Sequence, residues 1–136
     1  MSSGVLVIYQ RGRRGRAALA EGARLARNDG EELTVLALAP QDTDPAVCGV
    51  YTEAFNEGVR SVAQSELGEA RRLLGEETPD ATYAVLLAGR ERALGSWVAA
   101  QRFRLVLLTG SGLVGLRRRR GARRLERAGG AEVRLL

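Results

Sequence analysis

The stretch Val5-Leu6-Val7-Ile8-Tyr9, followed by Gln10-Arg11-Gly12-Arg13-Arg14-Gly15, decides the fold. Its first five residues are all apolar or aromatic, which is typical of a strand buried on both faces of a parallel sheet. The basic, glycine-containing part leads into segment 13–28, where small and apolar residues recur at helical spacing, and Gly30 is expected to end that helix. The stretch therefore predicts a strand, a tight turn and a helix, which together begin a β-α-β chain.

The rest of the chain repeats this alternation. Four more strand-like runs follow, at Leu33–Ala39, Thr82–Ala88, Leu105–Thr109 and Val133–Leu136. Three further helical segments separate them, at Glu53–Gly75 with Thr52 as N-cap, at Glu91–Phe103 and at roughly Leu116–Ala128. Because crossovers between parallel strands are right-handed, few topologies remain. We expect one α/β domain over residues 1–136, a doubly wound, five-stranded parallel sheet of order 3-2-1-4-5 with helices on both faces.

The long helix has a clear amphipathic pattern. Its apolar positions recur at steps of three and four, and they are Phe55, Val59, Val62, Ala63, Leu67, Ala70 and Leu74. Its acidic residues alternate with them, and they are Glu53, Glu57, Glu66 and Glu69. The pattern predicts that the first set packs on the sheet and the second forms a solvated surface.

Composition excludes several classes of site. The chain has no histidine, which removes the usual general base, triad member and metal ligand, so we expect no catalytic residue and no metal site. Cys48 is the single cysteine, so no internal disulfide can form, and the thiol is interpreted as structural or incidental. No apolar run reaches the length of a membrane span and no signal peptide is recognisable, so we expect a cytoplasmic protein without a membrane partner.

Charge is distributed unevenly along the chain. All 21 basic residues are arginine; residues 41–80 carry a net charge of −6 and residues 102–136 a net charge of +8. Arg11, Arg13, Arg14 and Arg16 follow the first strand, and Arg117–Arg120 lie near the start of the expected fourth helix. In the order 3-2-1-4-5 both clusters would flank one crevice, where a phosphate, a polyphosphate or a nucleic acid would offset their charge. A compositional bias towards arginine is the alternative explanation.

A glycine-rich turn follows the fourth strand. Leu108-Thr109-Gly110-Ser111-Gly112-Leu113-Val114-Gly115 lies between a strand and a helix, where backbone N–H groups can point at an anion. The arginine run and Gly121-Ala122 come next. A tight turn in a glycine-rich chain would have the same composition, so the motif alone is weak.

Together with length and element order, this turn resembles the universal stress protein family. That family has Gly-x-x-Gly after strand 4, then nine residues and Gly-Ser or Gly-Thr, and its ATP-binding members have an acid at the end of strand 1. Here Thr109 and Gly112 take the first two positions, and Gly121-Ala122 the last pair. Gln10 takes the place of the acid, and the end of the second strand near Leu38 would supply an apolar wall.

The resemblance implies a ligand-binding crevice at the ends of strands 1 and 4. Its candidate residues are Gln10, Thr109, Gly110, Gly112, Gly115, Arg117, Arg118, Gly121 and Ala122. Because Gln10, Thr109 and Ala122 depart from the family pattern, we expect weak ATP binding; another adenine nucleotide is a candidate ligand, and no cofactor is assigned.

The resemblance implies a non-enzymatic regulatory module in the stress response. We also expect a homodimer that pairs through the last strand, Val133–Leu136, because proteins usually protect an exposed sheet edge. A basic protein that binds polyanions or nucleic acid is the alternative, although no aromatic residue lies within either of the two arginine clusters. A nucleotide-dependent enzyme is the third reading, against which the absence of histidine and lysine counts.

Overall fold

The computed structural model describes residues 4–39, 50–75, 78, 80–87, 91–108 and 132–135. In chain order the elements are β1 (Gly4–Ile8), α1 (Arg13–Asp29), β2 (Glu32–Ala39), α2 (Val50–Leu74), β3 (Thr82–Leu87), α3 (Glu91–Gln101), β4 (Phe103–Leu108) and β5 (Glu132–Leu135). The expected fourth helix lies outside these residues. None of the helices so described combines the length and apolarity that a membrane span requires.

The five strands form one parallel sheet in the order β3-β2-β1-β4-β5, which confirms the predicted topology. β1 lies at its centre, where Val7 is in register with Val35 of β2 and Leu107 of β4. Every residue of β1 is buried, as its unbroken apolar sequence predicts. Because the strands are parallel, the ends of β1 and β4 lie side by side at the carboxyl edge of the sheet.

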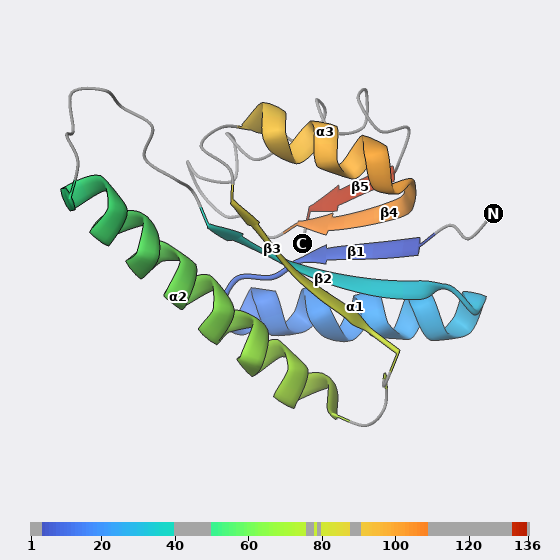
Figure 1. Ribbon diagram of the computed structural model, residues 1–136. Coiled ribbons are helices and arrows are strands. Elements are labelled where there is room, and N and C mark those ends of the chain that lie inside the picture. Colours follow the sequence, from blue (N-terminus) through green and yellow to red (C-terminus); the bar gives the residue numbers. More distant parts are fainter. Residues whose placement is uncertain are drawn as a thin grey trace.

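Helices cover both faces of the sheet, and alternate residues of β1 contact each layer (Figure 1). Val5 and Val7 pack towards α1 and α2, in a cluster that includes Leu19 of α1 and Ala70 of α2. Leu6 and Ile8 point to the other face and pack with side chains of α3, among them Val98 and Trp97. The prediction that helices pack on both faces of the sheet is therefore confirmed.

Glycines allow α1 to approach the sheet closely. A Cβ on Gly22 would lie 2.3 Å from Cγ2 of Val7, and one on Gly15 would lie 1.7 Å from the backbone oxygen of Gln10. No larger residue fits either position without a shift of the helix. At the other end, Gly30 adopts the left-handed conformation (φ 62°) and caps α1, as its place in the sequence predicts.

The structure corrects three expectations for α2. The helix begins at Val50, so Thr52 lies inside it and is not its N-cap. Val62 is 55% exposed, so the buried stripe runs through Ala63, Ala70 and Leu74 without it. Glu69 is not part of a solvated face, because its side chain is only 19% exposed and contacts the end of β1.

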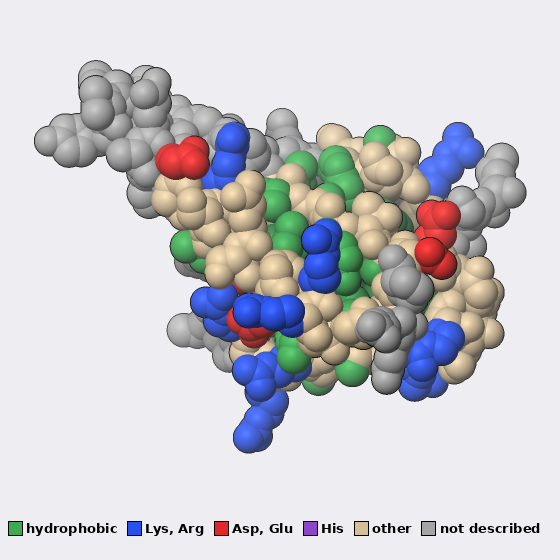
Figure 2. Space-filling view, turned by 60° about the horizontal axis from the view of Figure 1, so that its bottom comes forward, with side chains coloured by type: hydrophobic (Ala, Val, Ile, Leu, Met, Phe, Trp, Pro, Cys, Tyr) green, Lys and Arg blue, Asp and Glu red, His purple; other side chains and the backbone are tan. Residues whose placement is uncertain are grey.

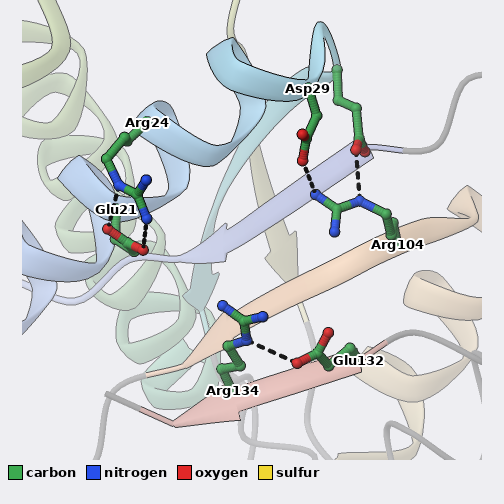
Figure 3. A network of polar contacts seen from close by, with 7 residues as sticks. Glu21, Arg24, Asp29, Arg104, Glu132 and Arg134 are labelled. Carbon is green, nitrogen blue, oxygen red and sulfur yellow. Dashed lines mark hydrogen bonds and ion pairs between the residues drawn. The ribbon is translucent and has the colours of Figure 1, made fainter.

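Arg104 ties the amino end of β4 to the turn between α1 and β2. Its Nε donates to Oε1 of Glu31 at 2.6 Å, and its Nη2 donates to Oδ2 of Asp29 at 2.8 Å (Figure 3). The two acids lie at the turn from α1 to β2, so this arginine of β4 fixes the turn against the central strands. Figure 3 also shows Arg134 and Glu132 of β5, whose ion pair lies on the α1 side of the sheet edge.

Candidate functional site

The candidate site lies at the carboxyl edge of the sheet, where β1 leads into α1. Tyr9 is fully buried, and the next residue, Gln10, is exposed. Leu38 lies near the end of β2, the strand that pairs with β1, and is 36% exposed. The other apolar side chains of β2 are largely buried. Gln10 and Leu38 are thus both exposed at this edge, and their contact with a ligand stays a prediction.

The turn from β1 to α1 is held by a polar cluster on α2. The hydroxyl of Tyr9 donates to Oε1 of Glu69 at 2.9 Å, and Nε of Arg11 donates to Oε2 of the same carboxylate at 2.7 Å. Nη2 of Arg11 also donates to the hydroxyl of Ser65 at 3.2 Å. One carboxylate therefore fixes a buried residue and an exposed residue of the turn, and through them the position of Gln10 between them.

The pKa values of this cluster follow from its geometry. Burial raises the pKa of Tyr9 to about 12, and the hydrogen bond to Glu69 adds to that rise. Hydrogen bonds from Tyr9 and then Arg11 lower the pKa of Glu69, whereas burial raises that of Glu66. Glu69 is therefore held as a carboxylate with a donor on each oxygen, which suits a structural anchor better than a general base.

The structure alters the expected arginine crevice. Arg11 is drawn to α2 by Glu69 and does not extend across β1 towards β4. Arg13, Arg14 and Arg16 are exposed along the first turn of α1. That turn has no acidic residue, and its N-cap, Gly12 (φ 133°), has no side chain to cap the helix. The amino end of α1 therefore remains a positively charged surface next to Gln10, without the contribution of Arg11.

The other predicted site residues lie outside the part of the chain that the structure describes. They are Thr109, Gly110, Gly112, Gly115, Arg117, Arg118, Gly121 and Ala122, and Cys48 is also among the residues not described. What can be placed is the strand that leads to them: β4 ends at Leu108 beside the end of β1. Among the described residues, no group of three potential metal ligands lies close enough to hold an ion.

Sequence reasoning missed the role of Glu69. Its position on α2 follows the spacing of the acidic face, and its partners lie about sixty positions earlier in the chain. The one available signal was Tyr9, because a buried tyrosine hydroxyl generally needs a hydrogen-bond partner. No local pattern indicates which acid supplies that partner.

Solved structures with this architecture include several universal stress proteins. One from Burkholderia pseudomallei has a TM-score of 0.70 and 13% identity, covering 98% of this chain and 95% of that chain. A universal stress protein in complex with cAMP has a TM-score of 0.68 and 11% identity, covering 100% and 98%. The protein from Archaeoglobus fulgidus in complex with dAMP has a TM-score of 0.65 and 14% identity, covering 99% and 97%.

Comparison of sequences adds no relative. No protein-family model matches the chain, and no curated protein sequence matches it. At 11–14% identity the structural likeness establishes the fold alone. The predicted fold is confirmed: this chain has the fold of the universal stress proteins.

Proposed function

We propose that this chain, with its universal stress protein fold, is a non-enzymatic regulatory module of the stress response. Its ligand would be an adenine nucleotide or another phosphorylated molecule, bound at the carboxyl edge of β1 and β4. The observation that carries the proposal is the exposed amide of Gln10, held by the Tyr9–Glu69–Arg11 cluster beside the basic amino end of α1.

Two kinds of contact would hold the ligand. The amide of Gln10 can donate to and accept from a base or ribose edge, and the exposed side chain of Leu38 can pack against a flat apolar surface. Phosphate groups would be attracted to the amino end of α1, where Arg13 and Arg14 are exposed. Structures of this fold in complex with cAMP and dAMP support a nucleotide of the monophosphate class as the first ligand to test.

The proposal includes weak binding of ATP. Gln10 has no carboxylate, Thr109 stands where the family has a glycine, and Ala122 lacks a hydroxyl. With Mg²⁺ present, we expect a dissociation constant for ATP above about 10 μM, equivalent to roughly −7 kcal/mol. Hydrolysis is not expected, because the chain has neither histidine nor lysine to assist phosphoryl transfer.

Isothermal titration calorimetry of the purified protein with AMP, cAMP and ATP–Mg²⁺ tests this function. Gln10→Ala should weaken the binding of the tightest of the three by about fivefold to tenfold, the effect of one lost hydrogen bond. Gln101→Ala is the matched control, because Gln101 is equally exposed but lies at the opposite edge of the sheet. Absence of heat with all three nucleotides at millimolar concentration would refute the proposal.

Homodimerisation through β5 is part of the proposed function. β5 is an edge strand that pairs with β4 on one side only. Val133 is half-buried against the α3 layer, and within Glu132–Leu135 the two charged side chains, Arg134 and Glu132, form an ion pair with each other. A two-fold pairing of β5 with its copy would extend the sheet across the axis, the closed assembly that is commonest among homo-oligomers.

The exposed arginines of α1 favour polyanion binding as a second candidate function. Polyphosphate or an oligonucleotide would bind with an affinity that falls steeply as salt rises. Changing Arg13 and Arg14 to Ala should reduce this binding, whereas Gln10→Ala should leave it unchanged. The two variants therefore distinguish a charge-driven surface from a nucleotide site.

A further inference from the structure

A groove runs along the outer surface between α1 and α2, from Arg16 in the first turn of α1 to Arg27 in its last turn. It encloses about 380 Å³, within the usual range for small-molecule sites. Eight residues line it: Arg16, Leu19, Ala20, Ala23, Arg24 and Arg27 from α1, and Leu73 and Leu74 from α2. Its lining thus consists of five apolar side chains and three arginines, with no carboxylate.

The spacing of residues along α1 explains the hollow. Arg16, Ala20, Ala23 and Arg27 follow one another at steps of three or four and so share one side of the helix. The two alanines are short, so they leave space between the long side chains at either end, which are separated by roughly 16 Å of helix. Leu73 forms part of the opposite wall and is 48% exposed, although most large apolar side chains of the described chain are covered.

Two of the arginines that line the groove, Arg24 and Arg16, differ in their partners. Arg24 is bound by Glu21, to which its Nε donates at 3.0 Å (Figure 3). Arg16 makes no ion pair with any residue that the structure describes, and its side chain is exposed at the end of the groove nearer β1. Figure 2 shows this side of the molecule, with arginine side chains spread over it and hydrophobic side chains visible between them.

We propose that this groove binds a small anionic amphiphile, an aliphatic chain that ends in a carboxylate or phosphate. The aliphatic chain would lie over Ala20 and Ala23 and against Leu73, where it would remove exposed apolar surface from water. The head group would lie at Arg16, whose guanidinium matches either anion. Three arginines and no acid are among the described residues that line the groove, so its charge favours an anionic ligand. The short apolar surface of Ala20 and Ala23 has room for a single aliphatic chain.

Decanoate, decyl phosphate and decanol, titrated against the full chain by calorimetry, test the proposal. We expect decanoate or decyl phosphate to bind at least about fivefold more tightly than decanol, a difference that shrinks as salt rises. The better of the two anions identifies the head group. Absence of binding by both anions, or equal binding of decanol, overturns the proposal.

Substitutions in the groove locate the site. Ala20→Leu fills the hollow at an exposed helical position, so it should preserve the fold and weaken binding at least about tenfold. Its control is Ala17→Leu, also exposed on α1 but outside the groove. Arg16→Gln should weaken binding by about threefold to fivefold, with Arg60→Gln of α2 as the control. Unchanged affinity in Ala20→Leu overturns the proposal.

A second copy of the chain is the alternative occupant. If Ala20→Leu changes the sedimentation of the unliganded protein, the groove is an interface between copies and the amphiphile proposal fails. Gln10 does not line the groove, so Gln10→Ala should leave decanoate binding unchanged. Loss of nucleotide binding in Gln10→Ala with unchanged decanoate binding would distinguish the failure of one proposal from that of the other.

Discussion

The contact between Gly15 and the end of β1 gives the sharpest test of how the fold builds the candidate site. An alanine Cβ at this position would lie 1.7 Å from the backbone oxygen of Gln10 and 2.9 Å from its carbonyl carbon. Because these are backbone atoms, a side-chain rotation cannot relieve the overlap. The first turn of α1 would have to move away from the strand by at least about 1.3 Å to reach the 3.0 Å limit of real Cβ contacts.

Overpacking of a well-packed site typically costs about 1–3 kcal/mol. We expect Gly15→Ala to lie at the upper end of this range, because the two atoms nearest the new Cβ belong to the backbone of Gln10. The higher helix propensity of alanine stabilises the variant by about 1 kcal/mol at most. We therefore expect the free energy of unfolding to fall by about 2–3 kcal/mol, a large fraction of the stability of a domain of this size. Displacement of Gln10 should also weaken nucleotide binding in the folded variant.

Gly68→Ala is the matched control, because it makes the same change inside a helix where nothing lies within 4 Å of the new Cβ. It should raise the free energy of unfolding by about 0.5–1 kcal/mol through helix propensity alone. Urea denaturation followed by circular dichroism measures both variants. A Gly15→Ala protein within about 0.5 kcal/mol of the wild type would refute the close approach of α1 to β1.

Three other predictions test different parts of the molecule. The pKa of Tyr9 rises from 10.0 to about 12 on folding, so the contribution of this tyrosine to stability is complete below pH 10 and is lost as pH rises through 12. The Tyr9→Phe variant should lack this loss of stability at high pH. Urea denaturation at a series of pH values measures it. In the Glu69→Gln variant, Tyr9 should ionise at lower pH than in the wild type, which absorbance at 295 nm measures. An unchanged titration of Tyr9 would contradict its hydrogen bond to Glu69. Arg104→Ala should lower the free energy of unfolding by about 1 kcal/mol, because it removes two partly screened ion pairs. Arg134→Ala removes one half-exposed ion pair and should lower the free energy of unfolding by less than about 0.5 kcal/mol. Equal losses in the two variants would argue against the double contact of Arg104. Leu135→Pro, which removes a backbone donor from β5, should convert the proposed dimer to a monomer in sedimentation at micromolar concentration, and a wild type that sediments near 14.6 kDa would exclude the dimer.

The sheet was predictable because its strands are nearly continuous in apolar residues. Val5–Tyr9 has one interpretation, a strand covered on both faces, and five such runs with right-handed connections leave few topologies. Strand and helix bounds still differ by one to three residues. β4, for example, begins at Phe103, a residue that the periodicity placed at the end of the preceding helix. Local pattern cannot distinguish the last turn of a helix from the first residue of a strand.

The candidate site was less predictable because it depends on partners far apart in the chain. Val62 fits the apolar spacing of α2 as well as Ala63 does, and only the angle at which the helix crosses the sheet decides between them. Glu69 is equally ambiguous, since an acid on a helix is ordinarily solvated. Arg11 was assigned to an anion site by its position after β1, but the carboxylate of Glu69 satisfies it instead. The places of Gln10 and Leu38 near the ends of β1 and β2 followed from the strand bounds, which local sequence does predict.

The central place of β1 in the sheet has a consequence for biosynthesis. Gly4–Ile8 leaves the ribosome before the other strands of the sheet, yet one of its two neighbours, β4, begins only at Phe103. Until that segment is made, the nascent chain can pair β1 with β2 but leaves its other side open, with apolar side chains and unpaired backbone groups exposed. Such an edge is a template for association with other chains. Stalled or truncated products that end before Phe103 should therefore aggregate or recruit chaperones, whereas chains that extend beyond Leu108 can close the edge.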